Sequence, residues 1–254
     1  MNFNKYQKTK LFRLALAIVP ALAIAGFFAF ATSNPHIWTN GLVGYWSFDG
    51  QYTTSTDGTK DVSNNGNYGQ FKNGVKPVAG ISGQALSFDG VDDIVDCGNG
   101  ASLNITSAIT IEAWVKPKAF ATYQGIVSKY QEENNGYILR LDSGVPKMYV
   151  FIPGGTWNSA GATSISTGQW YHIVGTYDKD GGANNLKLYI NGQLDNSNTV
   201  TGSIVSTTYS VRIGLSYINE WSNGPIDEVR IYSRALGADE VMQHYLQTRR
   251  NLKL

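Results

Sequence analysis

Alternating apolar and polar residues predict a series of short β-strands from residue 41 onward. In residues 109–116, Ile109 and Ile111 alternate with Thr110 and Glu112, a period of two that places neighbouring side chains on opposite faces of a strand. Turn residues separate these segments, which favours an all-β antiparallel sandwich or jelly roll. The predicted strands are 42–48, 85–89, 93–97, 109–116, 125–130, 136–142, 147–152, 170–177, 186–191, 209–213 and 226–232.

One hairpin turn and one helix stand out from this pattern. Asn191 and Gly192 form the positive-φ pair expected in a two-residue hairpin turn. Residues 238–247 predict a short terminal helix, because Asp239 and Glu240 stand in its first turn and apolar residues follow at helical spacing. We expect this helix to dock on the sandwich.

The first 31 residues predict an export signal. Residues 14–31 carry no charge and end in the small-residue pattern Ala-Phe-Ala, so cleavage would leave Thr32 as the first residue. The run is 18 residues long and contains Pro20 and Gly26, so an uncleaved membrane anchor stays open as the alternative. In either case the rest of the chain is placed outside the cytoplasm. The run follows four basic residues, Lys5, Lys8, Lys10 and Arg13.

The pattern therefore divides the chain into four parts. Residues 1–31 are a signal peptide or membrane anchor, 32–40 a spacer, 41–247 a single β-domain, and 248–254 a basic tail. Within the domain, the polar segment 51–67 predicts a long loop.

Composition narrows the function classes. Charged residues make up 15% of the chain, against about 25% in typical proteins, while hydrophobic residues reach 42%, so the chain can bury a core. A single Cys excludes an intrachain disulfide framework. The net charge is +1 and basic residues cluster only at the termini, so no electrostatic footprint for nucleic acid is present.

Seven motifs, in order along the chain, carry a resemblance to a known family. The sequence resembles the laminin-G-like, concanavalin-A-like jelly-roll superfamily, in its prokaryotic extracellular branch. The resemblance covers about 41–247. The motifs are GLVGYWSFD at 41–49, DVSNNGN at 61–67, ALSFDGVDD at 85–93, IEAWVKP at 111–117, QWYHIVGTYD at 169–178, LYING at 188–192 and IDEVRIY at 226–232.

The resemblance implies two curved antiparallel sheets, extracellular or cell-surface placement, and binding of carbohydrate or protein. It also implies a structural calcium ion. It does not specify a ligand, because this fold hosts lectins, adhesion modules and hydrolases alike.

Motifs for catalysis are not found in the sequence. Glycosidases of this fold place acidic residues at alternate strand positions, as E-x-D-x-E or E-x-D-x-x-E, and the nearest approach here is Asp92, Asp93 and Asp96. His172 lies in a strand at a spacing that suits neither a metal site nor a triad, so we expect a structural residue. Cys97, in an apolar strand, is expected to be a small buried hydrophobe. No catalytic residue is therefore assigned.

Metal binding is the chemistry that the residues favour most. The resemblance implies that Asp49, Asp89, Asp92 and Asp227 converge at one sandwich edge, with Asp89 and Asp227 as the leading ligands. Carboxylate and backbone oxygens are hard ligands, which calcium prefers over zinc's nitrogen and sulfur. The alternative is that Asp49 and Asp89, each followed by Gly, are ordinary turn caps.

Two polar segments offer aromatic residues for a ligand surface. Trp157 with Asn158, and Trp221 with Tyr217 and Asn219, lie outside the periodic strands. An aromatic ring beside amides can stack on the apolar face of a sugar while the amides bond its hydroxyls. The alternative is that these rings fold back and cap the sandwich. The other tryptophans of the motifs are expected in strand packing: Trp46, Trp114 and Trp170.

Two classes of function remain beyond the fold. The favoured one is an exported, non-catalytic module that binds a glycan or extracellular matrix component. The alternative is a surface structural or adhesion subunit that binds protein or its own copies through exposed strand edges. A polysaccharide hydrolase or lyase is the third interpretation.

Overall fold

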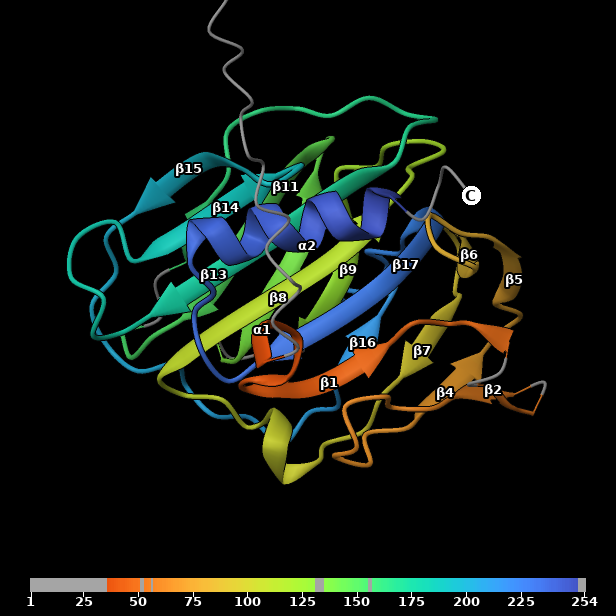
Figure 1. Ribbon diagram of the computed structural model, residues 1–254, viewed down its shortest axis with the longest axis horizontal. Helices are drawn as coiled ribbons and strands as arrows, with labels where there is room; N and C mark the ends of the chain where they lie inside the picture. The colour runs from red at the N-terminus through yellow and green to blue at the C-terminus, as the bar shows by residue number, and fades with distance from the viewer. Residues whose placement is uncertain (1–35, 51–52, 56, 131–134, 155–156, 251–254) are drawn as a thin grey trace, which may run out of the picture. The chain divides into compact units, whose positions relative to one another are not determined.

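A computed structural model describes residues 36–50, 53–55, 57–130, 135–154 and 157–250. The chain divides into two compact units, Met1–Asn34 and Pro35–Leu254, and the described residues all belong to the second. This unit is a sandwich of two antiparallel sheets with a C-terminal helix, so the predicted fold class is confirmed (Figure 1). The predicted export segment lies outside the described residues.

The first sheet, called sheet A here, has eight strands. Its long strands β8, β13 and β17 form the centre, and β1 pairs with β17 beside them. In order across the sheet the strands are β15 (Gln193–Asn198), β14 (Leu186–Ile190), β13 (Tyr171–Asp178), β8 (Ala108–Val115), β17 (Asn223–Tyr232), β6 (Gln84–Asp89) and β5 (Lys76–Ala79), with β1 (Leu42–Trp46) off this path.

The second sheet, sheet B, has nine strands. Its two ends differ, because longer strands stand at one end and very short strands at the other. The order is β12 (Trp157–Ala160), β11 (Val145–Phe151), β10 (Tyr137–Asp142), β9 (Tyr123–Lys129), β16 (Arg212–Ile213), β7 (Ile94–Asp96), β4 (Gly69–Lys72), β3 (Gly58–Thr59) and β2 (Thr53–Ser55).

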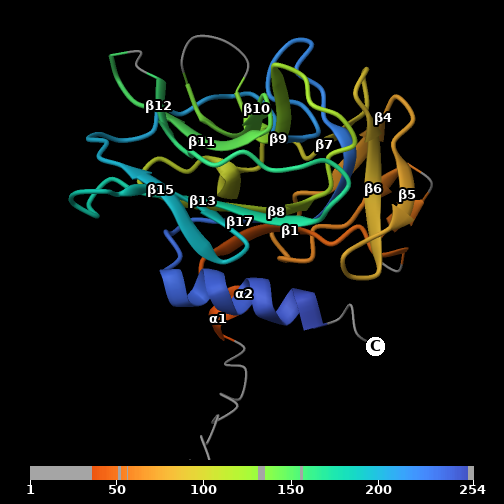
Figure 2. The same ribbon diagram turned by 90° about the horizontal axis from the view of Figure 1, so that it is seen from above.

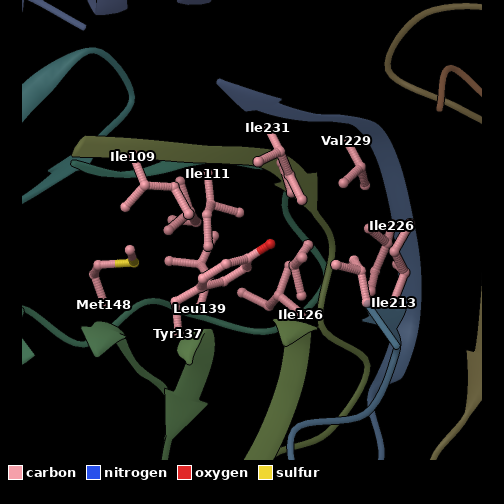
Figure 3. Close-up of a cluster of buried hydrophobic side chains, with 14 of the residues drawn as sticks. Ile109, Ile111, Ile126, Tyr137, Leu139, Met148, Ile213, Ile226, Val229 and Ile231 are labelled. Carbon is pink, nitrogen blue, oxygen red and sulfur yellow. The ribbon is translucent and has the colours of Figure 1, made fainter. Parts of the chain in front are cut away.

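The hydrophobic core lies between the inner faces of the two sheets. Ile109, Ile111 and Ile231 from sheet A face Leu139 and Met148 from sheet B (Figure 3), and all five are fully buried. Each contributes about 1.5–3 kcal/mol to folding through burial of apolar surface. Successive side chains of these strands therefore lie alternately in the core and on the outer face, which is the pattern that predicted the strands. The predicted burial of Cys97 and Trp46 is likewise confirmed.

Helix α2 (Ala238–Arg250) covers the outer face of sheet A (Figure 2). Arg234 and the backbone N–H of Gly237 both bond Glu240, which fixes the start of the helix. Beside α2 lies the short helix α1 (His36–Thr39), and the 3-10 helix η2 (Ala101–Leu103) stands between β7 and β8. None of the helices in the described part of the chain is long and apolar enough to span a bilayer.

All eleven predicted strands overlap strands of the structure, but six further strands were missed: β2, β3, β4, β5, β12 and β15. Most of these are two to four residues long, which is too short for an alternation to be recognised. The predicted loop at 51–67 contains β2 and β3, and the predicted spacer at 32–40 contains α1. The helix extends three residues beyond the prediction, so Arg249 and Arg250 belong to its last turn rather than to a tail.

Candidate functional site

Tyrosines, one arginine and two carboxylates gather on the outer face of sheet B. This tyrosine–arginine cluster consists of Tyr123, Arg140, Asp142, Tyr149 and Glu220. The Arg140 Nε donates to Asp142 Oδ1 over 2.6 Å, and its Nη1 reaches Glu220 Oε2 at 3.2 Å. The guanidinium carbon lies 4.2 Å from the ring centre of Tyr123 and 4.7 Å from that of Tyr149. Arg140 is thus held by two carboxylates and two aromatic rings.

Strand register explains this assembly. Arg140 and Asp142 are two residues apart on β10, so they share the face opposite to the buried Leu139 and Leu141. Glu220 lies in the connection between β16 and β17. The backbone oxygen of Glu220 accepts a hydrogen bond from the N–H of Gly125 on β9 over 2.9 Å. The cluster therefore joins neighbouring strands to one loop.

The cluster is polar but only partly open to solvent. The side chains of Asp142 and Glu220 are 19% and 15% exposed, whereas that of Arg140 is 5% exposed. Tyr123 is 42% exposed and offers its ring to solvent. Burial, together with the hydrogen bond to Asp142, raises the pKa of Tyr149 to about 12, so its hydroxyl stays a donor at neutral pH. The cluster can present carboxylate acceptors beside an accessible aromatic ring.

An aromatic stack continues the same face. Tyr130 and Phe151 stack with ring centres 4.7 Å apart, and Tyr217 lies tilted at 5.7 Å from Tyr130. Trp157 is the strand partner of Phe151, and its side chain lies outside the described residues. Asn158, the next residue along β12, is the strand partner of Val150, which belongs to the core, so Asn158 stands on the face opposite to the aromatic stack.

The predicted ligand residues Tyr217, Asn219 and Trp221 belong to one tight loop above this face. Asn219 has a φ of 62°, and the N–H of Glu220 donates to the Tyr217 oxygen over 3.1 Å. Trp221 is half-buried and forms an isolated bridge with Leu215 at the base of the loop. The loop thus carries Tyr217 and Glu220 to the face of sheet B, and the sequence reasoning missed Tyr123, Arg140 and Asp142 because they lie within or beside regular strands.

The four aspartates expected at one edge are divided by the structure into two pairs. Asp227 is fully buried and accepts hydrogen bonds from the N–H groups of Ile81 and Ser82 at 2.9 and 3.2 Å. Asp49 accepts one from Gln84 at 3.0 Å. Both side chains therefore fasten the turn between β5 and β6 from distant parts of the chain, which differs from a local turn cap. Burial raises the pKa of Asp227 to about 8.

Asp89 and Asp92 lie at the other end of β6, together with Asp93. Oxygens of these three carboxylates lie within 4.8 Å of one another. Asp89 Oδ1 accepts from the N–H of Val91 at 2.8 Å, and Asp93 Oδ2 accepts from that of Asp89 at 3.0 Å. Asp93 Oδ1 is buried and has no hydrogen-bond partner among the described residues. Burial, and next the neighbouring Asp89, raise the pKa of Asp93. This hard-oxygen set with an unsatisfied buried carboxylate oxygen fits a calcium ion.

The expected structural role of His172 agrees with its surroundings on sheet A. Glu112, on the outer face beneath α2, lies 3.8 Å from His172 Nε2, 2.8 Å from His244 Nδ1 and 2.7 Å from Arg230. Burial alone would raise the pKa of Glu112, but His244, His172 and Arg230 hold it well below its usual range. Arg230 also pairs with Glu228. These groups are buried and bonded to one another, so they form an internal network.

Solved structures with the same fold include binding domains of larger proteins. Domain 4 of AbnA, a GH43 extracellular arabinanase from Geobacillus stearothermophilus in complex with arabinotriose, is 24% identical with a TM-score of 0.66, over 80% of this chain and 97% of that chain. The binding domain of Paraclostridial Mosquitocidal Protein 1 is 20% identical with a TM-score of 0.65, over 82% and 52%. That of Botulinum Neurotoxin DC, in complex with SialylT, is 13% identical with a TM-score of 0.64, over 83% and 52%.

The present chain thus spans the whole of the arabinanase domain but about half of each toxin chain. No curated protein matches the sequence. A family model, Laminin_G_3, described as the concanavalin A-like lectin/glucanases superfamily, matches residues 88–242, more than half of the chain. The chain belongs to the concanavalin A-like lectin/glucanase superfamily.

Proposed function

We propose that the protein is an exported, non-catalytic module that binds a glycan through the outer face of sheet B. The observation that carries this proposal is the tyrosine–arginine cluster. The half-exposed ring of Tyr123 offers an apolar face to a sugar ring, and Asp142 and Glu220 offer acceptors to its hydroxyl groups. Tyr217, which lies beside the ring of Tyr130, extends the aromatic surface.

The ligands of similar structures support this class of ligand. The arabinanase domain was solved with arabinotriose and a botulinum binding domain with SialylT. Their identities to this chain are 24% and 13%, so they support a sugar ligand in general and no particular sugar.

The contacts within the cluster support binding without turnover. Glycoside cleavage needs one carboxylic acid that stays protonated near neutral pH and a second that stays ionised. Here Arg140 engages both Asp142 and Glu220, and the Tyr149 and Ser216 hydroxyls donate to them as well. The two carboxylates therefore share one arginine and have similar surroundings, not the two contrasting environments that an acid and base pair needs.

A titration with defined oligosaccharides tests the proposal. Contacts of this kind imply dissociation constants in the millimolar to micromolar range, about −4 to −8 kcal/mol. We expect Tyr123→Ala to weaken binding at least tenfold, and Tyr123→Phe, which keeps the ring, to retain most of it. Leu194→Ala, at an exposed position on the edge strand of sheet A, is the matched control. Release of reducing ends would instead indicate a hydrolase, and self-association without glycan binding would favour a structural or adhesion subunit.

We further propose a structural calcium ion held by Asp89, Asp92 and Asp93. Calcium would neutralise three adjacent carboxylates and give a partner to Asp93 Oδ1. Binding only to the folded state adds about 2.7 kcal/mol at a concentration one hundred times the dissociation constant. Melting curves in calcium and in chelator should therefore separate, and Asp89→Asn should remove the separation while Asp49→Asn retains it. Superimposable wild-type curves would contradict the site.

Export is part of the same proposal and has its own test. The uncharged run before Thr32 and the preceding basic residues support delivery outside the cytoplasm. The intact mass of the protein from its native source should correspond to a chain that begins at Thr32. A mass that includes residues 1–31 would indicate a retained membrane anchor.

A further inference from the structure

A depression of about 650 Å³ lies at the short-stranded end of sheet B, away from the tyrosine–arginine cluster. Figure 2 shows β4 and β12 toward opposite ends of this sheet. Gln70 on β4 and Arg140 on β10 are separated by four strand steps, or about 19 Å at about 4.8 Å per step. The lining residues are Asp57, Gly58, Tyr68, Gly69, Gln70, Phe71 and Lys72.

Alternation along β4 places three side chains in a row on the exposed side. Tyr68, Gln70 and Lys72 are exposed, whereas Gly69 is buried and Phe71 packs against the core. Tyr68 is 58% exposed, the second most exposed of the large hydrophobic residues in the described chain. A large ring held at the wall of a depression without core contacts is available to a ligand.

The polar groups of the depression retain hydrogen-bonding capacity. Lys72 Nζ donates to Gln70 Oε1 over 3.0 Å, which orients the amide. The Gln70 amide NH₂ and the other ammonium protons of Lys72 have no protein acceptor among the described residues. Opposite Gln70, Gly58 on β3 carries no side chain and leaves the floor of the depression open. The site thus combines an aromatic wall with hydrogen-bond donors.

We infer that this depression is a second saccharide-binding site, in which a sugar ring stacks on Tyr68 and its oxygens accept hydrogen bonds from Gln70 and Lys72. The ligand class rests on the proposed function, and the site is new. The two sites differ in polarity, because the cluster offers carboxylate acceptors and the depression offers donors. Accordingly the depression suits neutral sugar oxygens as acceptors, because Asp57 also lines it and would repel a carboxylate.

The sheet between the two sites is covered, so they engage separate sugar units. Ser128 on β9 and Ile138 on β10 are strand partners on the outer face of sheet B, yet both are fully buried. The Ser128 hydroxyl donates to the Leu215 backbone oxygen over 2.7 Å, so this part of the face is covered. Two separated contacts on one molecule increase the apparent affinity for a multivalent glycan surface, because the second contact becomes intramolecular.

The test is a titration of the whole protein with arabinotriose and with a sialylated trisaccharide, monitored residue by residue by NMR. Wild type, Tyr68→Ala, Tyr68→Phe, Tyr123→Ala and the double variant Tyr68→Ala/Tyr123→Ala are compared. We expect Tyr123→Ala to retain a weaker binding event that shifts the Gln70 and Lys72 signals. Tyr68→Ala should weaken that event at least tenfold, and Tyr68→Phe should preserve it.

The outcomes separate this site from the proposed function. Binding that Tyr123→Ala abolishes and Tyr68→Ala leaves unchanged would overturn the second site and keep the first. Binding that Tyr68→Ala abolishes and Tyr123→Ala leaves unchanged would support the depression and refute the cluster. No binding by wild type of either trisaccharide, with folded spectra throughout, would overturn both.

Discussion

The outer faces of the two sheets carry the same residue types, arginine, carboxylates and aromatic rings, but differ in how far these side chains are covered. On sheet A, Glu112 and Arg230 are buried beneath α2, whose buried His244 bonds Glu112. Trp38 from α1 stacks on His244 with ring centres 4.1 Å apart and closes the edge of the network. Each of these three groups has a charged partner within the protein.

On sheet B, Arg140 is equally engaged, but its carboxylate partners and Tyr123 reach solvent. The covering element makes the difference, since α2 covers the first face whereas a short loop and scattered side chains cover only part of the second. A polar row on a strand therefore indicates a binding surface only where no helix covers it.

The largest expected effect comes from breaking the covered network. Arg230→Ala would leave Glu112 and Glu228 without their shared counter-charge in a buried site, at a cost of about 3–5 kcal/mol in the free energy of unfolding. Arg140→Ala should cost about 1–2 kcal/mol, because water can reach Asp142 and Glu220. Urea unfolding of the two variants measures the difference.

Equal losses for the two arginine variants would contradict the contrast between the faces. Hydrogen exchange gives a second readout that does not depend on global stability. In Arg230→Ala the amides of α2 should exchange faster, since the helix rests on this network through His244. In Arg140→Ala the protection of α2 should be unchanged.

A buried ammonium group with no carboxylate partner among the described residues sharpens the comparison. Lys129 on β9 is 1% exposed, and its ammonium donates to Asn99 and to the Tyr209 backbone oxygen. Burial lowers its pKa to about 8 from 10.5. Between these values the unfolded chain binds more protons than the folded one, so the stability contribution of Lys129 rises with pH from about 8 to 10.5.

Lys129→Met tests this dependence. The variant should lack the wild-type rise in unfolding free energy across that range, a difference of about 1–3 kcal/mol between the two pH profiles. Urea unfolding at pH 7, 9 and 10.5 gives both profiles. Lys187→Met, on the neighbouring sheet and half-exposed, is the control and should follow wild type. Parallel profiles for wild type and Lys129→Met would refute the lowered pKa.

The strands could be predicted from the sequence because one face of each long strand must enter the core. Ile109 and Ile111 show this alternation plainly, and the motifs identified the family. The outer faces were not predictable, because alternation marks Glu112 and Arg140 alike as outward-facing. Which of them is covered depends on where α2 docks, and that is a tertiary contact.

The candidate site was only partly predictable for a related reason. Tyr217 was identified because it stands in a polar loop, while Tyr123 and Tyr68 stand at strand ends, where aromatic residues usually pack. The expected convergence of Asp49 and Asp227 with Asp89 and Asp92 rested on family resemblance. The structure separates the pairs by the length of β6, which no spacing in the sequence reveals.

The smallest expected effect concerns the stability of the proposed binding residues. Tyr68 is 58% exposed, so Tyr68→Ala should change the free energy of unfolding by no more than about 0.5 kcal/mol. Tyr123→Ala should cost somewhat more, about 0.5–1 kcal/mol, because Arg140 loses an aromatic contact. Urea midpoints at equal m-values measure both changes. A residue whose removal weakens glycan binding tenfold and leaves folding intact is held at the surface for its ligand, whereas a loss of several kcal/mol at Tyr68 would show that its ring belongs to the fold.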